Sequence, residues 1–479
     1  MTRLDILKLG LARFLNVITA HMKKELHFFN QLVKKLIHNE EFNPVSKPIE
    51  NHDVIEQLNL EFNDEGINDQ DWEKLIETVA LHTPKTASKL FFNQLYGGRQ
   101  PKAILGDLLA VILNNSMYTY KVAGPQSGIE KVILNKVCKL IDYPKTANGT
   151  IAPGGSLSNF MALVMARDST VKSTPNIGVS HKMTLYTSKE SHYSIPKNAA
   201  FAGIGRDQVR FVKTNQKGEM NIQLLNEAIE YDKDQGYIPF FVNATAGTTV
   251  LGAFDNIEAI HKICKKHQLW LHVDGAYCGG VIFSKRYKSL VKGIEHSDSF
   301  SFNAHKMLGT PLTCSIIVTR DKSQLFKSFN NEADYLYQTD DDDFDLGKTS
   351  LQCGRRNDAL KFWTLWKSIG NIGLEKLVNQ QFYLAQVARK YIKNHPDYNL
   401  YSFENSISIC FNYKDIPANE ICTLLYEKAQ AMVGFGSFDS VEFIRLITIN
   451  ANNSEGDILH FFKVLEKGVK KLELESVLK

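Results

Sequence analysis

Lys306 has a setting in this sequence that could support covalent chemistry. It lies in the segment FNAHKM, residues 302–307, directly after an apolar stretch that we expect to form a strand. A lysine at the end of such a strand would direct its amine into the cleft where α/β sheets bind ligands. Burial lowers the pKa of a lysine, which makes its amine a competent Schiff-base nucleophile. An ordinary surface lysine is the alternative that the local sequence leaves open.

Asp274 is a second candidate, at the end of the apolar stretch WLHV and before GAY, residues 275–277. A carboxylate at the end of a buried strand needs a cationic partner. A protonated pyridinium nitrogen would be one, and the ion pair would keep such a ring an electron sink. The alternative is an aspartate that only caps the following turn.

Two further segments could hold a ligand of this kind. PGGSLSN, residues 153–159, precedes an apolar helix, and its glycines and hydroxyls together with the helix N-terminus suit an anion. His192, in SKESHYS at residues 188–194, could stack on a ring. A plain turn and a solvent-facing histidine are the respective alternatives.

The elements that must position these residues alternate between strand and helix from about residue 150. A helix with Ile222, Leu225 and Ile229 on one face lies among them, and another begins at Asp255 with a capping-box Glu258. Such alternation predicts βαβ units and a mainly parallel sheet covered on both faces. The expected strands are 183–187, 209–212, 237–244, 269–273, 299–302 and 314–319.

The length of 479 residues exceeds what one hydrophobic core usually supports. We predict an N-terminal helical segment over 1–100, a large ligand-binding domain over 101–370, and a smaller α+β domain over 371–479. The first segment carries a helical stripe, which predicts packing on the chain itself or clasping of a partner subunit. A membrane or targeting role for this stripe is the less favoured alternative. Its members are Leu4, Leu7, Leu11, Leu15 and Ile18.

Composition excludes several classes of function. A net charge of +4 is too small to indicate a nucleic-acid partner, and no P-loop motif occurs. The seven cysteines are odd in number and show no C-x-x-C spacing, which argues against a disulfide framework or a zinc site. We therefore predict no metal and a reducing, cytoplasmic location. The longest charge-free stretch, 237–254, contains Pro239 and Asn243 and does not resemble a membrane span.

The motifs above, taken in order, resemble those of the group II pyridoxal-5′-phosphate (PLP) dependent amino-acid decarboxylases, near the glutamate and cysteine-sulfinate enzymes. The resemblance covers roughly residues 80–470. It implies the aspartate aminotransferase-like fold type I with a seven-stranded sheet, and a homodimer with shared active sites. It rests on FFNQL (91–95), PGG (153–155), SHYS (191–194), ATAGTT (244–249), HVD (272–274), NAHKM (303–307) and LQCGR (351–355).

The resemblance also implies roles for individual residues. Lys306 would carry PLP, Asp274 would pair with the pyridine nitrogen, and His192 would stack on the ring. Gln94 and Arg445 would hold the acidic groups of the substrate. The remaining cofactor contacts would be Ser156, Leu157, Ser158, Thr249, Ala276, Ser299 and His305, with Cys353 and Gly354 supplied by the neighbouring subunit.

Tyr335 resembles the mobile-loop tyrosine that returns a proton to the substrate carbon, and the acidic run 340–343 after it fits a lid. A packing aromatic is the alternative for this tyrosine. The reaction implied is α-decarboxylation of an acidic L-amino acid. An aminotransferase or lyase reaction is one rival, and a catalytically silent binding relative is another, although the chain keeps Lys306, Asp274 and Arg445.

Some positions depart from the family pattern. Ala304 replaces the usual proline, for which we expect a small local effect. Ser116 and Tyr118 stand where glutamate decarboxylases carry Asn and Phe, and Tyr96 adds an aromatic. A bulkier pocket favours a shorter acid, so aspartate or cysteine sulfinate fits at least as well as glutamate. Arg99 could add a cationic contact, which leaves the substrate open.

Overall fold

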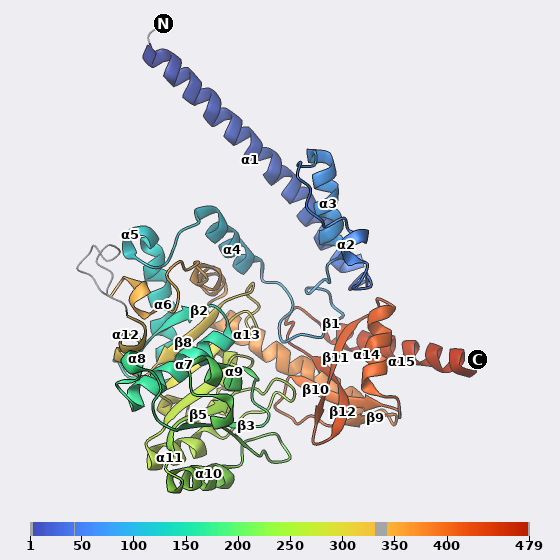
Figure 1. The fold of residues 1–479 in the computed structure, drawn as a ribbon. Helices are drawn as coiled ribbons and strands as arrows, with labels where there is room; N and C mark the ends of the chain where they lie inside the picture. The colour runs from blue at the N-terminus through green and yellow to red at the C-terminus, as the bar shows by residue number, and fades with distance from the viewer. Residues whose placement is uncertain (1–2, 43, 331–342, 478–479) are drawn as a thin grey trace. The chain divides into compact units, whose positions relative to one another are not determined.

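The computed structural model describes residues 3–42, 44–330 and 343–477 (Figure 1). The chain divides into two compact units, each made of pieces distant in sequence, whereas the three predicted segments follow chain order. One unit comprises Met1–Phe91, Ile421–Val433 and Phe461–Lys479. The other comprises Phe92–Glu420 and Gly434–His460.

The larger unit is built on a seven-stranded sheet. Six strands run in one direction, and β8 runs antiparallel to both of its neighbours. This confirms the predicted mainly parallel sheet, and each predicted strand lies within one or two residues of its expected place. In spatial order the strands are β2 (Asn148–Ala152), β8 (Ser315–Thr319), β7 (Ser299–Asn303), β6 (Trp270–Gly275), β5 (Ile238–Thr245), β3 (Met183–Ser188) and β4 (Val209–Val212).

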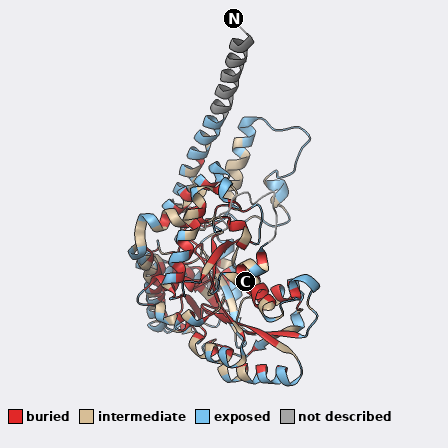
Figure 2. Cartoon of the chain, turned by 90° about the vertical axis from the view of Figure 1, so that its left-hand side faces the viewer, coloured by how far each residue is buried: buried red, intermediate tan, exposed pale blue. Residues whose placement is uncertain are grey.

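The central strands are buried on both faces because helices cover them, as the concentration of buried residues along the strands shows (Figure 2). Helix α7 (Gly155–Thr170) packs against most of the strands, and nine of its sixteen residues are buried. Helices α10 (Ile222–Asp234) and α11 (Ile257–His267) bury only one apolar stripe each. This arrangement leaves the carboxyl ends of the strands for ligands.

The start of α11 differs from the prediction. Its N-cap is Asn256, whose side chain accepts the amide hydrogen of Ala259. Asp255 instead lies in the core, where its carboxylate accepts the N–H groups of Met220 and Thr245. The capping-box pattern therefore identified the helix but assigned the cap one residue too early.

The larger unit contains further helices around the sheet. One of them, the long helix α13 (Ala359–Lys393), leads to a second sheet and is interrupted at Gly370, whose φ is 64°. The others are α4 (Pro101–Leu113), α5 (Tyr120–Ala123), α6 (Pro125–Leu140), α8 (Thr174–Ile177), α9 (Ser194–Phe201) and α12 (Ser323–Phe329), with 3-10 turns η1 (Arg206–Gln208), η2 (Gly279–Phe283), η3 (Lys288–Val291), η4 (Ile294–His296) and η5 (Leu346–Thr349).

The second sheet is mainly antiparallel and consists mostly of strands that follow α13. It contains five strands in the order β1 (Phe91–Phe92), β11 (Met432–Phe438), β12 (Val441–Ile447), β10 (Ser408–Tyr413) and β9 (Tyr398–Leu400). Helices α14 (Ala418–Glu427) and α15 (Glu455–Val477) complete the C-terminal region, and β1 precedes α4.

The smaller unit begins with one long helix, α1 (Arg3–Phe42), followed by α2 (Val54–Gln57) and α3 (Asp69–His82). Lys35 of α1 pairs with Glu77 of α3 at 2.6 Å. The predicted apolar stripe lies in the part of α1 whose side chains are outside the described residues. Across the described ranges, no helix is long and apolar enough to cross a membrane.

Asp298, just before β7, makes the stability of the fold depend on pH. Burial raises the pKa of this carboxyl from 3.8 to about 6, so folding favours the protonated form. Its stabilising contribution is thus complete below pH 3.8 and is lost as pH rises through about 6. Over this interval the free energy of unfolding should fall by up to about 1.4 kcal/mol per pH unit for this group.

We expect Asp298→Asn to flatten that dependence, because the amide oxygen can still accept the Leu271 N–H, which lies 2.7 Å from the carboxylate. Urea unfolding between pH 4 and 7 measures the difference. A residual slope is expected from Asp255, whose buried carboxyl also has a pKa raised to about 6. An unchanged slope in the variant would contradict the assignment to Asp298.

Candidate active site

A cavity lies at the carboxyl ends of β5, β6 and β7, where the first turn of α7 approaches them. Backbone and side chains from four loops converge there, as expected for the ligand site of a parallel sheet. The lining residues are Gly155, Ser156, Asn159, His192, Thr245, Gly247, Thr249, Asp274, Ala276, Tyr277, Asn303, His305 and Lys306.

Lys306 follows β7 and presents its amine to this cavity. Burial lowers the pKa of the amine, and the nearby carboxylate of Asp274 opposes part of that change. A lysine with a lowered pKa has more of its unprotonated, nucleophilic form at neutral pH. The position suits covalent attachment of an aldehyde-bearing ligand.

Asp274 ends the core of β6 and is buried, at 3% exposure. One carboxylate oxygen accepts the Ala276 N–H at 2.9 Å, and the other accepts the Asn159 amide at 2.7 Å. The capping interaction considered from the sequence is therefore present, and the same residue also lines the cavity. A buried carboxylate in this place can pair with a cationic group of a ligand.

The α7 end of the cavity has the character of an anion site. Gly154 has a φ of 116°, and Gly155 and Ser156 open the helix. A Cβ at Gly155 would lie 2.8 Å from the amide nitrogen of Asn303, so glycine leaves a cradle that a side chain would fill. The start of a sixteen-residue helix attracts negative charge.

His305 adds a donor to this region. Its Nδ1 lies 2.9 Å from the Cys314 nitrogen and 3.2 Å from the Cys314 oxygen. When Nδ1 accepts the Cys314 N–H, the ring proton is on Nε2 and can be donated to a phosphate oxygen. Burial lowers the pKa of this ring to about 3, which keeps it neutral.

His192 lines the cavity from the loop after β3. Burial lowers its pKa, with a smaller contribution from Lys306, so the ring is uncharged and able to stack. Together with the amine of Lys306, the carboxylate of Asp274 and the glycine cradle, it fits PLP: aldehyde, pyridine nitrogen, ring face and phosphate each meet a suitable group.

Three predicted cofactor contacts lie elsewhere. Leu157 and Ser158 direct their N–H groups to the Gly154 carbonyl within the first helical turn, and neither lines the cavity. Ser299 begins β7, at the opposite end of the strand from Lys306, and its hydroxyl contacts His272. A direct phosphate contact by Ser299 is therefore corrected.

Asn159 and Asn303 line the cavity but were not predicted as site residues. Both lie within the quoted motifs, in 153–159 and 303–307, so the signal was present in the sequence. Asn303 accepts a hydrogen bond from Ser315 at 2.7 Å, which fixes the amide beside Gly155.

Arg445 on β12 lies beside the cavity wall. Its guanidinium donates to the carbonyl of the lining residue Thr249 at 2.7 Å and to the carbonyl of Asn93 at 3.4 Å. Its buried Nε has no partner among the described residues. Asn93 precedes Gln94, so the structure brings the segment of Gln94 and Tyr96 near the predicted partner Arg445.

The other predicted contacts form a separate cluster in this chain. Ser116 accepts the Arg355 N–H at 3.4 Å, and the carbonyl of Tyr118 accepts the Gly347 N–H at 2.8 Å. Cys353 and Gly354 are exposed next to Arg355. None of these predicted residues lines the cavity of their own chain. Tyr335 and residues 340–342 of the predicted lid lie outside the described residues.

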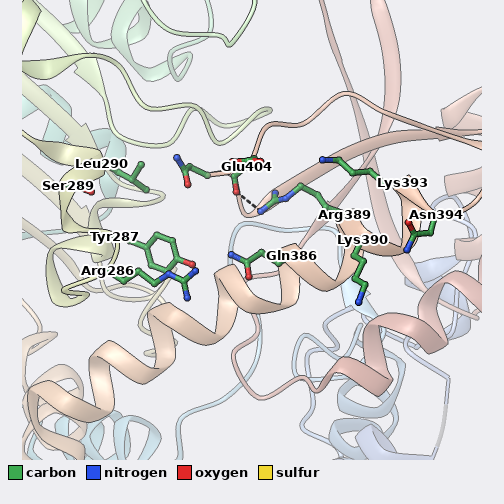
Figure 3. A pocket seen from close by; sticks show the side chains of 11 residues that line it. Arg286, Tyr287, Ser289, Leu290, Gln386, Arg389, Lys390, Lys393, Asn394 and Glu404 are labelled. Atoms are coloured by element: carbon green, nitrogen blue, oxygen red, sulfur yellow. Dashed lines mark hydrogen bonds between the residues drawn. The ribbon is translucent and has the colours of Figure 1, made fainter.

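A second pocket, also lined by cationic side chains, provides a comparison for the cavity (Figure 3). It is lined by Arg286, between η2 and η3, and by Lys390, Lys393 and the buried Arg389 at the end of α13. The Arg389 guanidinium donates to backbone carbonyls, including that of Glu404 at 2.5 Å. Among the described residues, the lining of this pocket includes lysines and Ser289 but, unlike the cavity with Asp274, no buried carboxylate.

Comparison with known proteins agrees with this geometry. The pyridoxal-dependent decarboxylase conserved domain matches residues 52–414. Cysteine sulfinic acid decarboxylase of Mus musculus is 35% identical over 433 residues, which are 85% of this chain and 88% of the relative. Acidic amino acid decarboxylase GADL1 of Xenopus tropicalis is 36% identical over 427 residues, 84% of this chain and 83% of the relative. The crystal structure of mouse CSAD in apo form has a TM-score of 0.90 at 32% identity and covers 94% of this chain and 99% of that one.

Proposed function

Because the chain belongs to the pyridoxal-dependent decarboxylase family, with the conserved domain over residues 52–414, we propose that it α-decarboxylates a short acidic L-amino acid. Aspartate and cysteine sulfinate are the first candidates and glutamate is the third. The fold is the predicted PLP fold type I, and PLP is the cofactor. The observation that supports an acidic substrate is the position of Arg445, whose guanidinium donates to the carbonyl of Thr249 in the cavity wall.

Each candidate site residue has its own role in the proposed reaction. PLP, when bound, supplies the electron sink for the bond that breaks. Lys306 attaches the cofactor and takes up and returns a proton at its amine, which burial makes readily deprotonated. Asp274 would pair with the pyridine nitrogen and balance its positive charge. His192 would lie against the ring and help to exclude water. The predicted role of Tyr335 is to return a proton to the substrate carbon.

Arg445 supports recognition of a second acidic group on the substrate. A guanidinium presents a fork of donors that matches a carboxylate or sulfinate. Ser116, Tyr118 and Tyr96 would set the length of the acid, and the bulk of the two tyrosines favours a short one. Since Ser116 and Tyr118 lie outside the cavity of their own chain, this proposal requires a second subunit.

We expect carbon dioxide release from aspartate or cysteine sulfinate to exceed that from glutamate in kcat/KM. One methylene in a shaped pocket is worth about 10–200-fold. The measurement compares the three acids on purified, PLP-loaded protein, and Arg445→Gln is expected to raise KM for all of them. A preference for glutamate would show that Ser116, Tyr118 and Tyr96 do not set chain length. Cofactor binding without release from any acid would favour an aminotransferase, a lyase or a silent relative.

A homodimer with shared sites is supported by the surface of α4. Leu105, Leu109 and Ile112 are 51%, 42% and 65% exposed on this helix, and three more apolar side chains of α4 are also exposed. A contiguous apolar surface of this kind marks an interaction site. Asp107 of the same helix pairs with Arg356, next to Cys353 and Gly354. A dimer interface at α4 would therefore place the separate cluster of one subunit, which includes Ser116 and Tyr118, at the cavity of the other subunit.

Ile112→Glu is expected to convert the dimer to monomer and to abolish carbon dioxide release, because each cavity would lose the partner's residues. Light scattering after gel filtration and the activity assay measure both effects. Ile177→Glu is the matched control, since Ile177 is 67% exposed on the separate helix α8. A dimeric, active Ile112→Glu variant would contradict the proposed interface.

A cytoplasmic location remains a proposal. Its support is that all seven cysteines are free and that only Cys353 is exposed.

A further inference from the structure

A chain of hydrogen bonds leads from Asp274 into the protein, away from the cavity. Asn159 contacts Asp274 at 2.7 Å and His272 at 3.1 Å. His272 contacts the Ser299 hydroxyl at 2.9 Å, and the indole nitrogen of Trp270 reaches the same hydroxyl at 2.9 Å. Asn159, His272 and Ser299 are at most 1% exposed. Ser299, which lies away from the cavity, is therefore a member of this series of hydrogen bonds.

The direction of each bond follows from Asp274. A carboxylate only accepts, so Asn159 must turn its NH₂ group toward Asp274 and its oxygen toward His272. His272 must then carry its proton on Nε2, which leaves Nδ1 as an acceptor for the Ser299 hydroxyl. The Trp270 N–H can only donate, so it donates to Ser299. Every donor in this series of hydrogen bonds therefore points toward the Asp274 carboxylate.

The neutral state of His272 is required for this order and is provided by its surroundings. Burial lowers the pKa of the ring to about 4. The ring stacks on Phe241 with centroids 5.9 Å apart, which fixes its plane. A protonated ring would turn Nδ1 into a donor and reverse the bond to Ser299.

We infer that Asn159, His272 and Ser299 are positioning residues for the cofactor, which orient the Asp274 carboxylate and stabilise its charge where the pyridine nitrogen binds. Aligned hydrogen bonds polarise one another, and donors to a carboxylate favour its charged form. Ordered outer partners of a binding residue hold it in its productive orientation. The inference rests on the PLP site of the proposed function but not on the identity of the substrate.

The test compares two pairs of variants. A glutamine amide nitrogen can occupy the place of the imidazole Nε2, whereas an asparagine amide nitrogen occupies that of Nδ1. His272→Gln should therefore retain the donor to Asn159, and His272→Asn should lose it. Ser299→Ala removes the hydroxyl that contacts His272. Ser297→Ala is its matched control, because Ser297 is equally buried just before β7 and its hydroxyl contacts Ile294 and Tyr143, which are not part of this series of hydrogen bonds.

The readouts are the dissociation constant of PLP, from absorbance titration of cofactor-free protein, and the pH midpoint of the visible band of the bound cofactor. We expect His272→Asn to weaken PLP binding about tenfold or more and to shift the midpoint. Ser299→Ala should weaken binding by about threefold, and His272→Gln by a similar factor because it also loses the contact with Ser299, whereas Ser297→Ala should stay within about twofold of the parent protein. The melting temperature of the cofactor-free protein separates a loss of folding from a loss of positioning.

Equal PLP affinity and equal pH midpoints in His272→Asn, Ser299→Ala and Ser297→Ala would overturn the inference. Equal losses in Ser299→Ala and Ser297→Ala would also overturn it, since the effect would then follow the loss of any buried serine hydroxyl. Both readouts are independent of carbon dioxide release, so failure of the proposed substrate does not affect them.

Discussion

Lys306→Ala is expected to lower carbon dioxide release on the order of 10³-fold or more, because it removes the group that attaches the cofactor and exchanges protons there. Burial lowers the pKa of the amine, and the charge of Asp274 opposes part of that change. Among the described residues, Lys306 is the one lysine that lines this cavity. The measurement combines the activity assay with the visible absorption of protein-bound PLP.

Lys306→Arg separates the nucleophile from the charge. The guanidinium keeps a cation near Asp274 but cannot supply a free amine at any ordinary pH. Both variants should therefore lose activity and the band of covalently bound cofactor. Retention of that band in either variant would assign the attachment to another residue and would remove the basis of the proposed mechanism.

Glu130→Gln is expected to destabilise the protein by about 3–5 kcal/mol, because it leaves a buried arginine without its counterion. Arg355 and Glu130 are 4% and 1% exposed, and their side chains meet at 2.6 Å. The Arg355 guanidinium also donates to Thr150 of β2 at 2.8 Å. Removing one charge of such a pair costs far more than the pair contributes when it is intact.

The substitution Glu130→Gln should also affect the active site. The backbone of Arg355 holds Met117 through a 2.8 Å hydrogen bond and contacts Ser116, so the buried pair anchors the separate cluster. Denaturant unfolding measures the stability, and the acid preference measures the effect on the cluster. Arg356→Met is the matched control: its ion pair with Asp107 has a 47% exposed guanidinium side chain and should contribute about 0–1 kcal/mol.

A double variant, Glu130→Leu with Arg355→Met, tests the cause. Replacing both charges by apolar groups of similar size removes the uncompensated charge, so the double variant should be more stable than Glu130→Gln. Equal losses in Glu130→Gln and Arg356→Met would show that burial does not decide the strength of these pairs.

The sequence alone determined the parts of this protein that depend on local patterns. Alternating strand and helix periods located the strands of the large sheet, since buried parallel strands are apolar throughout. Lys306, Asp274 and His192 follow strands β7, β6 and β3 along the chain or end them, and parallel strands bring such ends to one edge. Their convergence on one cavity could therefore be anticipated without coordinates.

Tertiary structure decided the contacts between segments that no local period relates. Ser299 and Lys306 are close in sequence, yet one lies at the beginning of β7 and the other beyond its end, where the strand separates them. The hydrogen bonds of Asn159 and the partnership of Arg355 with Glu130 join residues more than 100 positions apart. A buried polar group must find a partner wherever the fold provides one, and only the packed chain defines which groups meet.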